Sequence, residues 1–452
     1  FLISYLKNSI YLIKNYTLLN MEMLKKVAII GSGICGAYLA NALAAKYEVY
    51  VFEKARGLGG RSASKRQAET SFDYGVSYFS IQDPDLQSFL SGALLHENIE
   101  LLDRKIIKLD RNDKENSGNR IVESFPERTA RENTEGGVGE QSTEALFVSK
   151  PYGNSFAKLL LKDIKKIFLE TKIQSLVKNI VTKIEDCKQP QNGLVLQSLQ
   201  SDSKYKLVLE DAAEFDVDFD IIISTAPAEQ TARIYSKYDD LVKSLSTVKY
   251  NPAFVLMFSL KQSAELFSST VVSELISKIR DADILKIKNS IIEEVILNHK
   301  KPLRDSNTPA FVIKASKSFT ENNLEMEHAL IEEVLLNEFF SIMGFDVDSM
   351  PELGFKHLHR WLYSTPVIDS ECKDLVNIEF SENKENKALQ EIPRTFLKAE
   401  GEEIYAVGDY VLGLSSEFIN DQNNLVETDL EPSGVEASLL SARALARILN
   451  FS

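Results

Sequence analysis

Apolar and polar positions follow a strand–helix–strand order in the first quarter of the chain. An apolar run at Val27–Ile30 leads into a glycine-rich turn, an alanine- and leucine-rich stretch at Ala37–Lys46, and a second apolar run at Val49–Phe52. Short continuous apolar runs are typical of buried strands, whereas a longer stretch with apolar residues at helical spacing is typical of a helix. The order predicts a βαβ unit, with which a parallel sheet begins.

The later elements that we predict show the same kind of apolar patterning. They are a helix at about 155–168, strands at 220–227 and 250–260, a helix that ends at Gly344, a strand at 404–407 and a C-terminal helix. The run at 220–227 stops at a proline, as a buried parallel strand does where it ends at a ligand crevice. The C-terminal helix starts with Ser433–Glu436, which matches a capping box. The apolar stripe of the helix before Gly344 consists of Ile331, Leu335 and Phe339, joined by Leu330 and Val334.

Three segments lack such a pattern. Residues 111–145 are polar and charged, with Phe125 as their only aromatic residue, so they are predicted to be a disordered or loop insertion. Residues 261–310 are rich in lysine, and no element is predicted there. Residues 1–22 are kept out of the fold as an N-terminal extension of unknown role.

The turn after the first strand has the spacing of a dinucleotide-binding fingerprint. Gly31 allows the tight turn, Gly33 has no Cβ to block a pyrophosphate, and Gly36 lets helix and strand pack closely. Glu53 follows the first glycine by 53 − 31 = 22 residues, where it can accept hydrogen bonds from an adenosine ribose. The helix N-terminus offers N–H groups and a positive dipole end to the diphosphate. The residues assigned to this site are Gly31, Ser32, Gly33, Ile34, Cys35, Gly36 and Glu53.

A second glycine-rich element, the segment KARGLGGR from Lys54 to Arg61, follows the ribose acid. It suits a loop that folds back over the diphosphate, which Arg56 or Arg61 would neutralise. A plain NAD-binding domain does not need this element, so the segment favours FAD. The alternative is a solvated basic loop.

The distribution of glycines limits the number of dinucleotides. Between Gly193 and Gly344 the chain contains no glycine, so a second fingerprint cannot lie there, and none follows later. One bound dinucleotide is expected, and any nicotinamide would enter the same active site as a substrate.

Composition narrows the class of protein. With 452 residues and 44% hydrophobic content the chain can bury a large core, and two connected domains are expected. Lys and Arg number 52 against 66 Asp and Glu, and this net charge of −14 argues against nucleic acid or an anionic membrane as partner. No apolar run approaches the roughly 20 residues of a membrane span.

The cysteines and histidines give little sign of cross-links or metal. The three cysteines lie far apart, which predicts a reducing compartment and a cytoplasmic location. Only His357 and His359 lie close together among five histidines, so no metal site is expected.

Four segments together carry a family resemblance. The chain resembles the FAD-dependent amine-oxidase-like superfamily in VAIIGSGICG, VFEKARGLGGR, FDYGVSYF and the late YAVGDY, and within it is most similar to the renalases. The segments at 151–160, 359–366 and 433–446 also fit, so the resemblance spreads over most of residues 25–450.

The resemblance implies an α/β fold with two domains. One is a discontinuous Rossmann-type FAD-binding domain, and the other is an α+β substrate domain on a mixed or antiparallel sheet. The expected boundaries are 23–80, 146–230 and 400–452 for the FAD-binding domain, and 81–110 and 231–399 for the substrate domain.

The resemblance also implies further contacts with FAD. Arg56, Gly60 and Arg61 match the diphosphate loop, to which Lys54 also belongs, and Gly75 matches a glycine beside the flavin. Gly408–Asp409 match a second flavin-contact motif, in which Asp409 would accept from a ribityl hydroxyl. The helix after Gly434 and Val435 would direct its positive end at the flavin pyrimidine edge.

The expected activity is transfer of a hydride from a small reduced substrate to flavin N5, with electrons then passing to dioxygen. The renalase resemblance suggests a dihydronicotinamide isomer as the donor. Tyr78, Arg360 and Trp361 are the substrate-side candidates; the alternatives are core aromatic residues and a surface salt bridge. Other readings are a flavin amine oxidase or desaturase-like enzyme, a non-enzymatic flavin-binding interaction protein, and a plain NAD dehydrogenase. The oligomeric state is left open.

Overall fold

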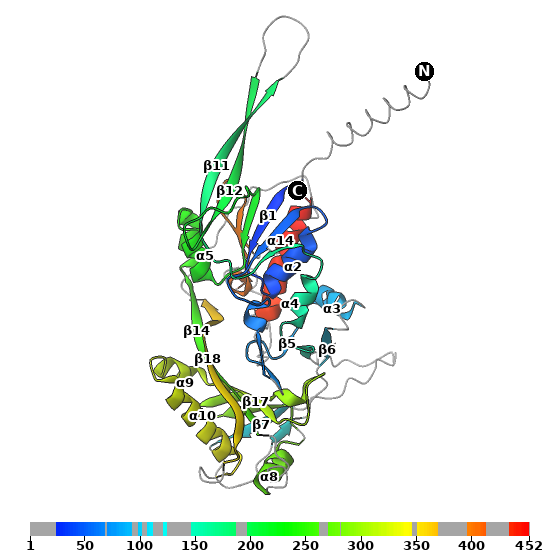
Figure 1. Ribbon diagram of the computed structural model, residues 1–452, viewed down its shortest axis with the longest axis vertical. Helices are drawn as coiled ribbons and strands as arrows, with labels where there is room; N and C mark the ends of the chain where they lie inside the picture. Colours follow the sequence, from blue (N-terminus) through cyan, green and yellow to red (C-terminus); the bar gives the residue numbers. More distant parts are fainter. Residues whose placement is uncertain are drawn as a thin grey trace, which may run out of the picture.

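Two β-sheets, one above the other along the long axis, organise the computed structural model (Figure 1). Two long strands of the second sheet, β14 (Val248–Leu260) and β18 (Leu353–Ile368), run from it toward the first. The structure describes residues 24–67, 70–92, 98–101, 106–111, 121–123, 146–186, 197–261, 270–280, 282–345, 350–368, 396–412 and 434–451.

The first sheet has six strands, and its first five are parallel. In spatial order they are β10 (Lys166–Phe168), β2 (Glu48–Phe52), β1 (Lys26–Ile30), β13 (Ile221–Ser224), β20 (Ile404–Ala406) and the antiparallel β19 (Leu397–Lys398). The predicted βαβ opening is confirmed, and α2 (Ile34–Leu43) connects β1 to β2. Every residue of β13 is buried, as expected for a central parallel strand.

Both faces of this sheet are covered. One face packs against α2, α3 (Pro84–Ser91), α4 (Ser155–Leu160) and the long α14 (Gly434–Phe451). The other packs against α5 (Ala228–Ile234), α6 (Asp239–Leu245) and the projecting hairpin β11 (Ile173–Asp186) and β12 (Gln197–Leu209). Helices on both faces of a mostly parallel sheet confirm the Rossmann-type prediction.

The second sheet has seven strands and is mixed, as predicted. Its remaining strands are β17 (Ala310–Ala315), β16 (Ile292–Leu297), β15 (Ile284–Lys288), β7 (Ile106–Asp110) and β8 (Ile121–Glu123). All neighbours are antiparallel except β15 and β7. One face packs against α8 (Thr270–Lys278) and α10 (His328–Ile342), with Phe319 of α9 (Lys317–Asn322) beside them.

Small elements join the two sheets. The hairpin β3 (Ser64–Arg66) and β4 (Ser71–Asp73) follows the turn η1 (Gly60–Ser62), and its Phe72 packs on the other face of the second sheet. The turn η2 (Asn298–Lys300) connects β16 toward β17. A three-stranded sheet contains β5 (Phe79–Ser80), β9 (Leu146–Ser149) and β6 (Ile99–Leu101), and α12 (Asp409–Leu412) follows β20.

Several local predictions were wrong. The helix expected at 155–168 ends at Leu160, and Lys166–Phe168 forms β10 at the sheet edge. Pairing with β2 decides this, because Phe168 stacks on Phe52 with ring centroids 5.2 Å apart. In α10, Leu330 and Val334 are 49% and 37% exposed rather than part of the buried stripe.

Some predictions concern residues that lie wholly or partly outside the described ranges. Most of the insertion at 111–145 lies outside them, although residues 121–123 form β8, which pairs with β7. Residues 1–22 and Ser433 also lie outside them. Glu436, the acid of the predicted capping box, accepts from the backbone N–H groups of Gln82 and Asp83, each at 2.7 Å, and the capping box itself stays a prediction.

The domain boundaries stay a prediction, but two helices pack on a different sheet from the one that those boundaries imply. Leu86 and Leu90 of α3 pack in the α2 core of the six-stranded sheet. Leu241 and Leu245 of α6 pack in the core on its other face. Both helices therefore pack with the Rossmann-type sheet, although the predicted boundaries assign them to the substrate domain.

Candidate cofactor and substrate site

The fingerprint turn combines two glycines in close contacts and one that faces open space. A Cβ on Gly36 would lie 2.1 Å from the Gly31 carbonyl oxygen, and a Cβ on Gly31, whose φ is +110°, would lie 2.5 Å from Thr225 Oγ1. A Cβ on Gly33 would meet no atom within 4 Å. Gly33 is the N-cap of α2 and provides no side-chain cap. The helix N-terminus therefore faces free space beside a residue without a side chain.

The acid of the fingerprint holds the turn in place. Glu53 is buried, and its Oε2 accepts from the Ser32 N–H at 3.0 Å and the Ser32 hydroxyl at 2.7 Å. Its Oε1 accepts from the Ala55 N–H at 2.8 Å. A carboxylate has about four acceptor positions, so one remains for a ribose hydroxyl.

The segment from Lys54 to Arg61 returns to the fingerprint turn, as predicted. The Gly59 N–H donates to the Ser32 carbonyl at 3.1 Å, and a Cβ on Gly60 would lie 3.1 Å from Gly33 Cα. Arg56 is exposed. The Lys54 ammonium donates to Gln230 at 2.9 Å, and burial lowers its pKa.

Arg61 and Asp409 form a bidentate ion pair. The Arg61 guanidinium donates to both carboxylate oxygens of Asp409 at 2.7 and 2.8 Å, and to the Ser364 carbonyl at 3.0 Å. Burial favours the neutral guanidinium, but the adjoining Asp409 raises the pKa of Arg61 above its usual range. Burial and the charge of Asp409 also raise the pKa of the Cys35 thiol in the first turn of α2. The structure thus brings the predicted diphosphate loop and the second flavin motif together.

The C-terminal motif lies at the same place. A Cβ on Gly434 would lie 3.3 Å from Asp409 Oδ2, and the Gly408 N–H donates to the Ser441 hydroxyl at 3.2 Å. Val435 is a buried core residue of α14. The start of α14 therefore adjoins Asp409.

Gly75 has a backbone role. A Cβ there would lie 1.8 Å from the Arg61 carbonyl oxygen, which also accepts from the Val76 N–H at 2.9 Å. The segment after β4 can approach η1 because this residue lacks a side chain.

Two of the three substrate-side candidates lie on one face of the second sheet. The Tyr78 hydroxyl donates to Glu294 of β16. Trp361 stacks on Tyr74, with ring centroids 5.5 Å apart, and donates its indole N–H to the Tyr74 carbonyl at 3.0 Å. Arg360 is exposed and donates to the Leu324 carbonyl at 2.8 Å on the α9–α10 side. Successive strand residues point to opposite faces, so Arg360 lies on the other face of β18 from Trp361, and its role at the substrate stays a prediction.

Several residues of this region carry no signal in the patterns used above. Glu294 and Lys286 lie within 261–310, where no element was predicted, and Tyr250, whose hydroxyl accepts from the Ala228 N–H, was not singled out. A different signal was present in Ile284–Lys288 (ILKIK), where lysine alternates with apolar residues at the period of a strand.

A family model and several solved structures match this chain in fold. A family model described as an NAD(P)-binding Rossmann-like domain matches residues 29–93. A protein assigned as a protoporphyrinogen oxidase from Exiguobacterium sp. 255-15 has a TM-score of 0.58 at 11% identity, covering 94% of this chain and 99% of that chain. Wild-type putrescine oxidase bound to putrescine has a TM-score of 0.57 at 10% identity, covering 95% and 99%. Reduced UDP-galactopyranose mutase has a TM-score of 0.57 at 13% identity, covering 95% and 96%. The chain is similar to these proteins in fold over nearly its whole length.

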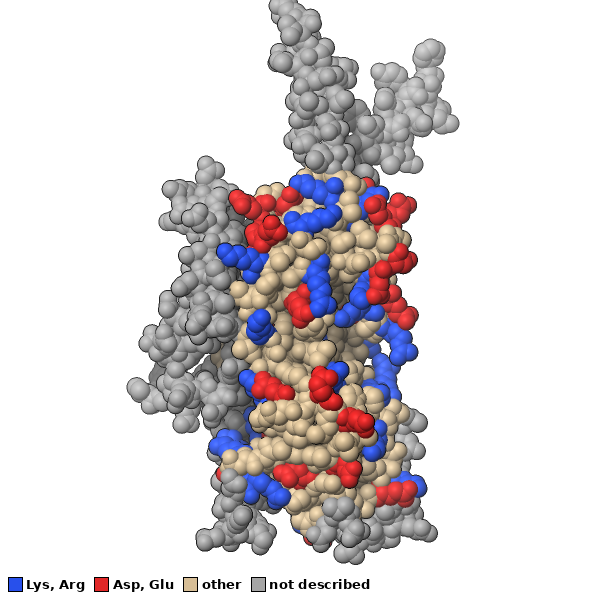
Figure 2. Space-filling view, turned by 90° about the vertical axis from the view of Figure 1, so that its left-hand side faces the viewer, with Lys and Arg blue, Asp and Glu red and all other residues tan. Residues whose placement is uncertain are grey.

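No described helix is long and apolar enough to cross a membrane. No group of three His, Cys, Asp or Glu side chains in the described ranges could hold a metal ion. On the face of the molecule shown in Figure 2, acidic and basic side chains are interspersed.

Proposed function

We propose that this protein is an FAD-dependent oxidoreductase that acts on a small molecule. The observation that carries the proposal is the fingerprint turn, in which Gly31 and Gly36 are packed against protein while Gly33 faces open space at the start of α2. The free N–H groups and dipole of that helix end are suited to a diphosphate. The residues present therefore fit the dinucleotide.

The surrounding residues would bind the rest of the cofactor. Glu53 would accept from the adenosine ribose, and the backbone of Gly59 and Gly60 would border the diphosphate. Asp409 would accept from a ribityl hydroxyl, and Arg61 would keep that carboxylate ionised and oriented. The start of α14 would direct its dipole at the flavin. When bound, the flavin would supply hydride acceptance at N5.

The substrate is proposed from the resemblance and not from a contact in the structure. A dihydronicotinamide isomer as hydride donor, dioxygen as acceptor and a cytoplasmic location follow from the renalase-like segments and the cysteine pattern. A flavin amine oxidase is the second candidate, because putrescine oxidase shares the fold over 95% of this chain.

Anaerobic reduction of the purified holoprotein separates these functions. We expect the protein to hold a flavin that is released on denaturation. Dihydronicotinamides should bleach its visible absorbance in a stopped-flow experiment. Bleaching by putrescine, with dihydronicotinamides inert, would establish the amine oxidase. A flavin that no reductant bleaches would favour a non-enzymatic binding protein.

A further inference from the structure

The second sheet presents a polar stretch on the face opposite to α10. Leu285, Val295 and Ile313 pack on the α10 side, so the alternating residues of the same strands point the other way. On that other face lie Phe72 and Tyr74, from the segment that contacts η1 of the cofactor site. This face is therefore the one directed toward the proposed flavin.

Strand register places three charged residues in one line across this face. Lys314 of β17 is opposite Glu294 of β16, and Glu294 is opposite Lys286 of β15. Directly opposite side chains on one face have Cβ atoms about 5 Å apart. We call Lys314, Glu294 and Lys286 the charged row. Lys108 of β7 continues the line beyond Lys286.

The charged row is close enough to the proposed cofactor site for a substrate at the flavin to reach it. Lys314 and His359 flank Val255 in the register of β14, and Arg61 donates to the carbonyl of Ser364 on the same strand as His359. Ser364 follows His359 by five positions, which correspond to about 16 Å along an extended strand. A flavin that extends from Asp409 toward the sheet can bring a substrate to the row.

Among the described residues, Glu294 has a neutral hydrogen-bond donor but no cationic group within 4.0 Å. Tyr78 donates to its Oε1, and within the described ranges no lysine or arginine lies within 4.0 Å of it. Lys314 donates to Glu293 at 3.3 Å, and Lys286 forms no hydrogen bond or ion pair with another described residue. The described groups that act on Glu294 are Tyr78, Lys314 and Lys286, with Glu293 beside it in the chain, and the buried Lys301 also interacts with it electrostatically.

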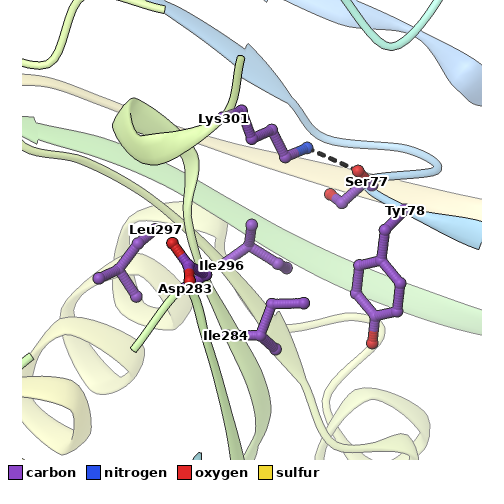
Figure 3. A pocket seen from close by; sticks show the side chains of 7 residues that line it. All are labelled: Ser77, Tyr78, Asp283, Ile284, Ile296, Leu297 and Lys301. Atoms are coloured by element: carbon purple, nitrogen blue, oxygen red, sulfur yellow. Dashed lines mark hydrogen bonds between the residues drawn. The ribbon is translucent and has the colours of Figure 1, made fainter. Parts of the chain in front are cut away.

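A small hollow borders the row. Figure 3 shows Tyr78 beside Ile284 and Ile296, the residues one position along from Lys286 and Glu294 on the same face. Lys301 also lines the hollow, but its ammonium donates to the Ser77 carbonyl at 2.7 Å and to Asp73. Asp283 lines the hollow as well, and the charged row lies next to it, one same-face position along β15 and β16.

We infer that the charged row binds an anionic group of the substrate, a carboxylate or phosphate, through Lys286 and Lys314, and that Glu294 takes up a proton when this anion binds. The inference rests on the proposed function for the presence of a substrate cavity. Two ammonium groups on either side of one acid attract an anion once that acid is neutral, whereas an ionised Glu294 repels it.

The environment of Glu294 supports the proton uptake. Burial raises the pKa of Glu294 above its usual value, and Lys314, the Tyr78 hydroxyl and Lys286 oppose this only in part. A bound anion adds a further negative charge and raises it again. Anion binding should therefore be tighter at lower pH.

Isothermal titration calorimetry of the holoprotein with benzoate and with benzylamine tests the inference. The two probes share a ring and differ in the sign of their charge. We expect benzoate to bind, more tightly at pH 6 than at pH 8, with proton uptake measured from the dependence of the heat on buffer. Glu294→Gln should bind benzoate about tenfold more tightly at pH 8 and without proton uptake, since it removes the repulsion. Lys286→Ala should bind it about tenfold more weakly.

Lys356→Ala is the matched control, because Lys356 pairs with Glu332 of α10 on the opposite side of the sheet. It should leave benzoate affinity unchanged, and thermal unfolding checks that each variant is folded. Benzylamine binding that Glu294→Gln weakens, or benzoate binding unaffected by both row variants, would overturn the inference. Calorimetry does not depend on flavin reduction. A protein that binds benzoate in this pattern but holds no flavin would therefore refute the proposed function alone.

Discussion

Two clusters of ion-paired side chains lie at the turn η1, and they differ in how deeply they are buried. In one, Asp73 is fully buried and contacts Lys301 at 2.9 Å and Arg304 at 2.7 Å, whose side chains are only 5% and 3% exposed. In the other, Asp409 is buried but its partner Arg61 has a side chain that is 33% exposed.

The Asp73 cluster also has more internal partners. Asp73 accepts from the Ser64 hydroxyl at 2.6 Å and from the Gly153 N–H at 2.8 Å. Arg304 further donates to Ser71. The cluster ties the β3–β4 hairpin to the loop after η2, which stabilises the junction of the two sheets. The partial exposure of Arg61 and the position of Asp409 beside Gly434 fit a pair that contacts a ligand.

The largest effect is expected from removing the buried acid. Asp73→Ala leaves Lys301 and Arg304 as unpaired buried cations, and should lower the free energy of unfolding by about 3–5 kcal/mol. Urea denaturation followed by circular dichroism measures this loss. A change below about 1 kcal/mol would show that the cluster is not structural.

Removing the second acid should affect the cofactor more than the fold. Asp409→Ala should weaken flavin binding about 10- to 100-fold, because it removes a charged acceptor and leaves Arg61 free to move. Fluorescence titration of the apoprotein with FAD measures this affinity. Asp83→Ala, which breaks the ion pair with Arg443, is the matched control and should leave the affinity for FAD unchanged. Equal loss of FAD affinity in both variants would remove the distinction between the clusters.

Acid should weaken the Asp73 cluster. Burial opposes ionisation of Asp73, but Lys301 and Arg304 hold its pKa below the usual value. The stabilisation is complete above the unfolded pKa of about 3.9 and is lost as the pH falls further, because the unfolded chain then binds the proton first. Unfolding free energy measured from pH 5 to pH 3 should fall less steeply in Asp73→Asn than in the wild type. Parallel slopes would contradict the assignment.

The smallest effect is expected at the sequence candidate that lies on the other face. Arg360→Ala removes one exposed hydrogen bond to Leu324 and should change stability by no more than about 0.5 kcal/mol. It should leave kcat/KM for any substrate within about twofold of the wild type. A tenfold loss of kcat/KM would place Arg360 in the active site.

The sequence predicted the part of the site that is local in the chain. Gly31, Gly33, Gly36 and Glu53 lie within 22 residues, so their roles depend on one βαβ unit whose spacing is visible directly. The charged row could not be predicted in this way, because it needs the register of β15, β16 and β17. The face on which Arg360 lies could not be predicted for the same reason: it depends on the pairing of β18 with β14, and no local pattern shows which face meets the proposed cofactor.

Flavin content of the Gly33→Trp variant tests the central claim most directly. Ala45→Trp places the same side chain at an exposed position just after the other end of α2. We predict that both variants fold, that Ala45→Trp holds flavin at the wild-type ratio, and that Gly33→Trp holds none even with excess FAD. Wild-type flavin content in a folded Gly33→Trp protein would contradict the account.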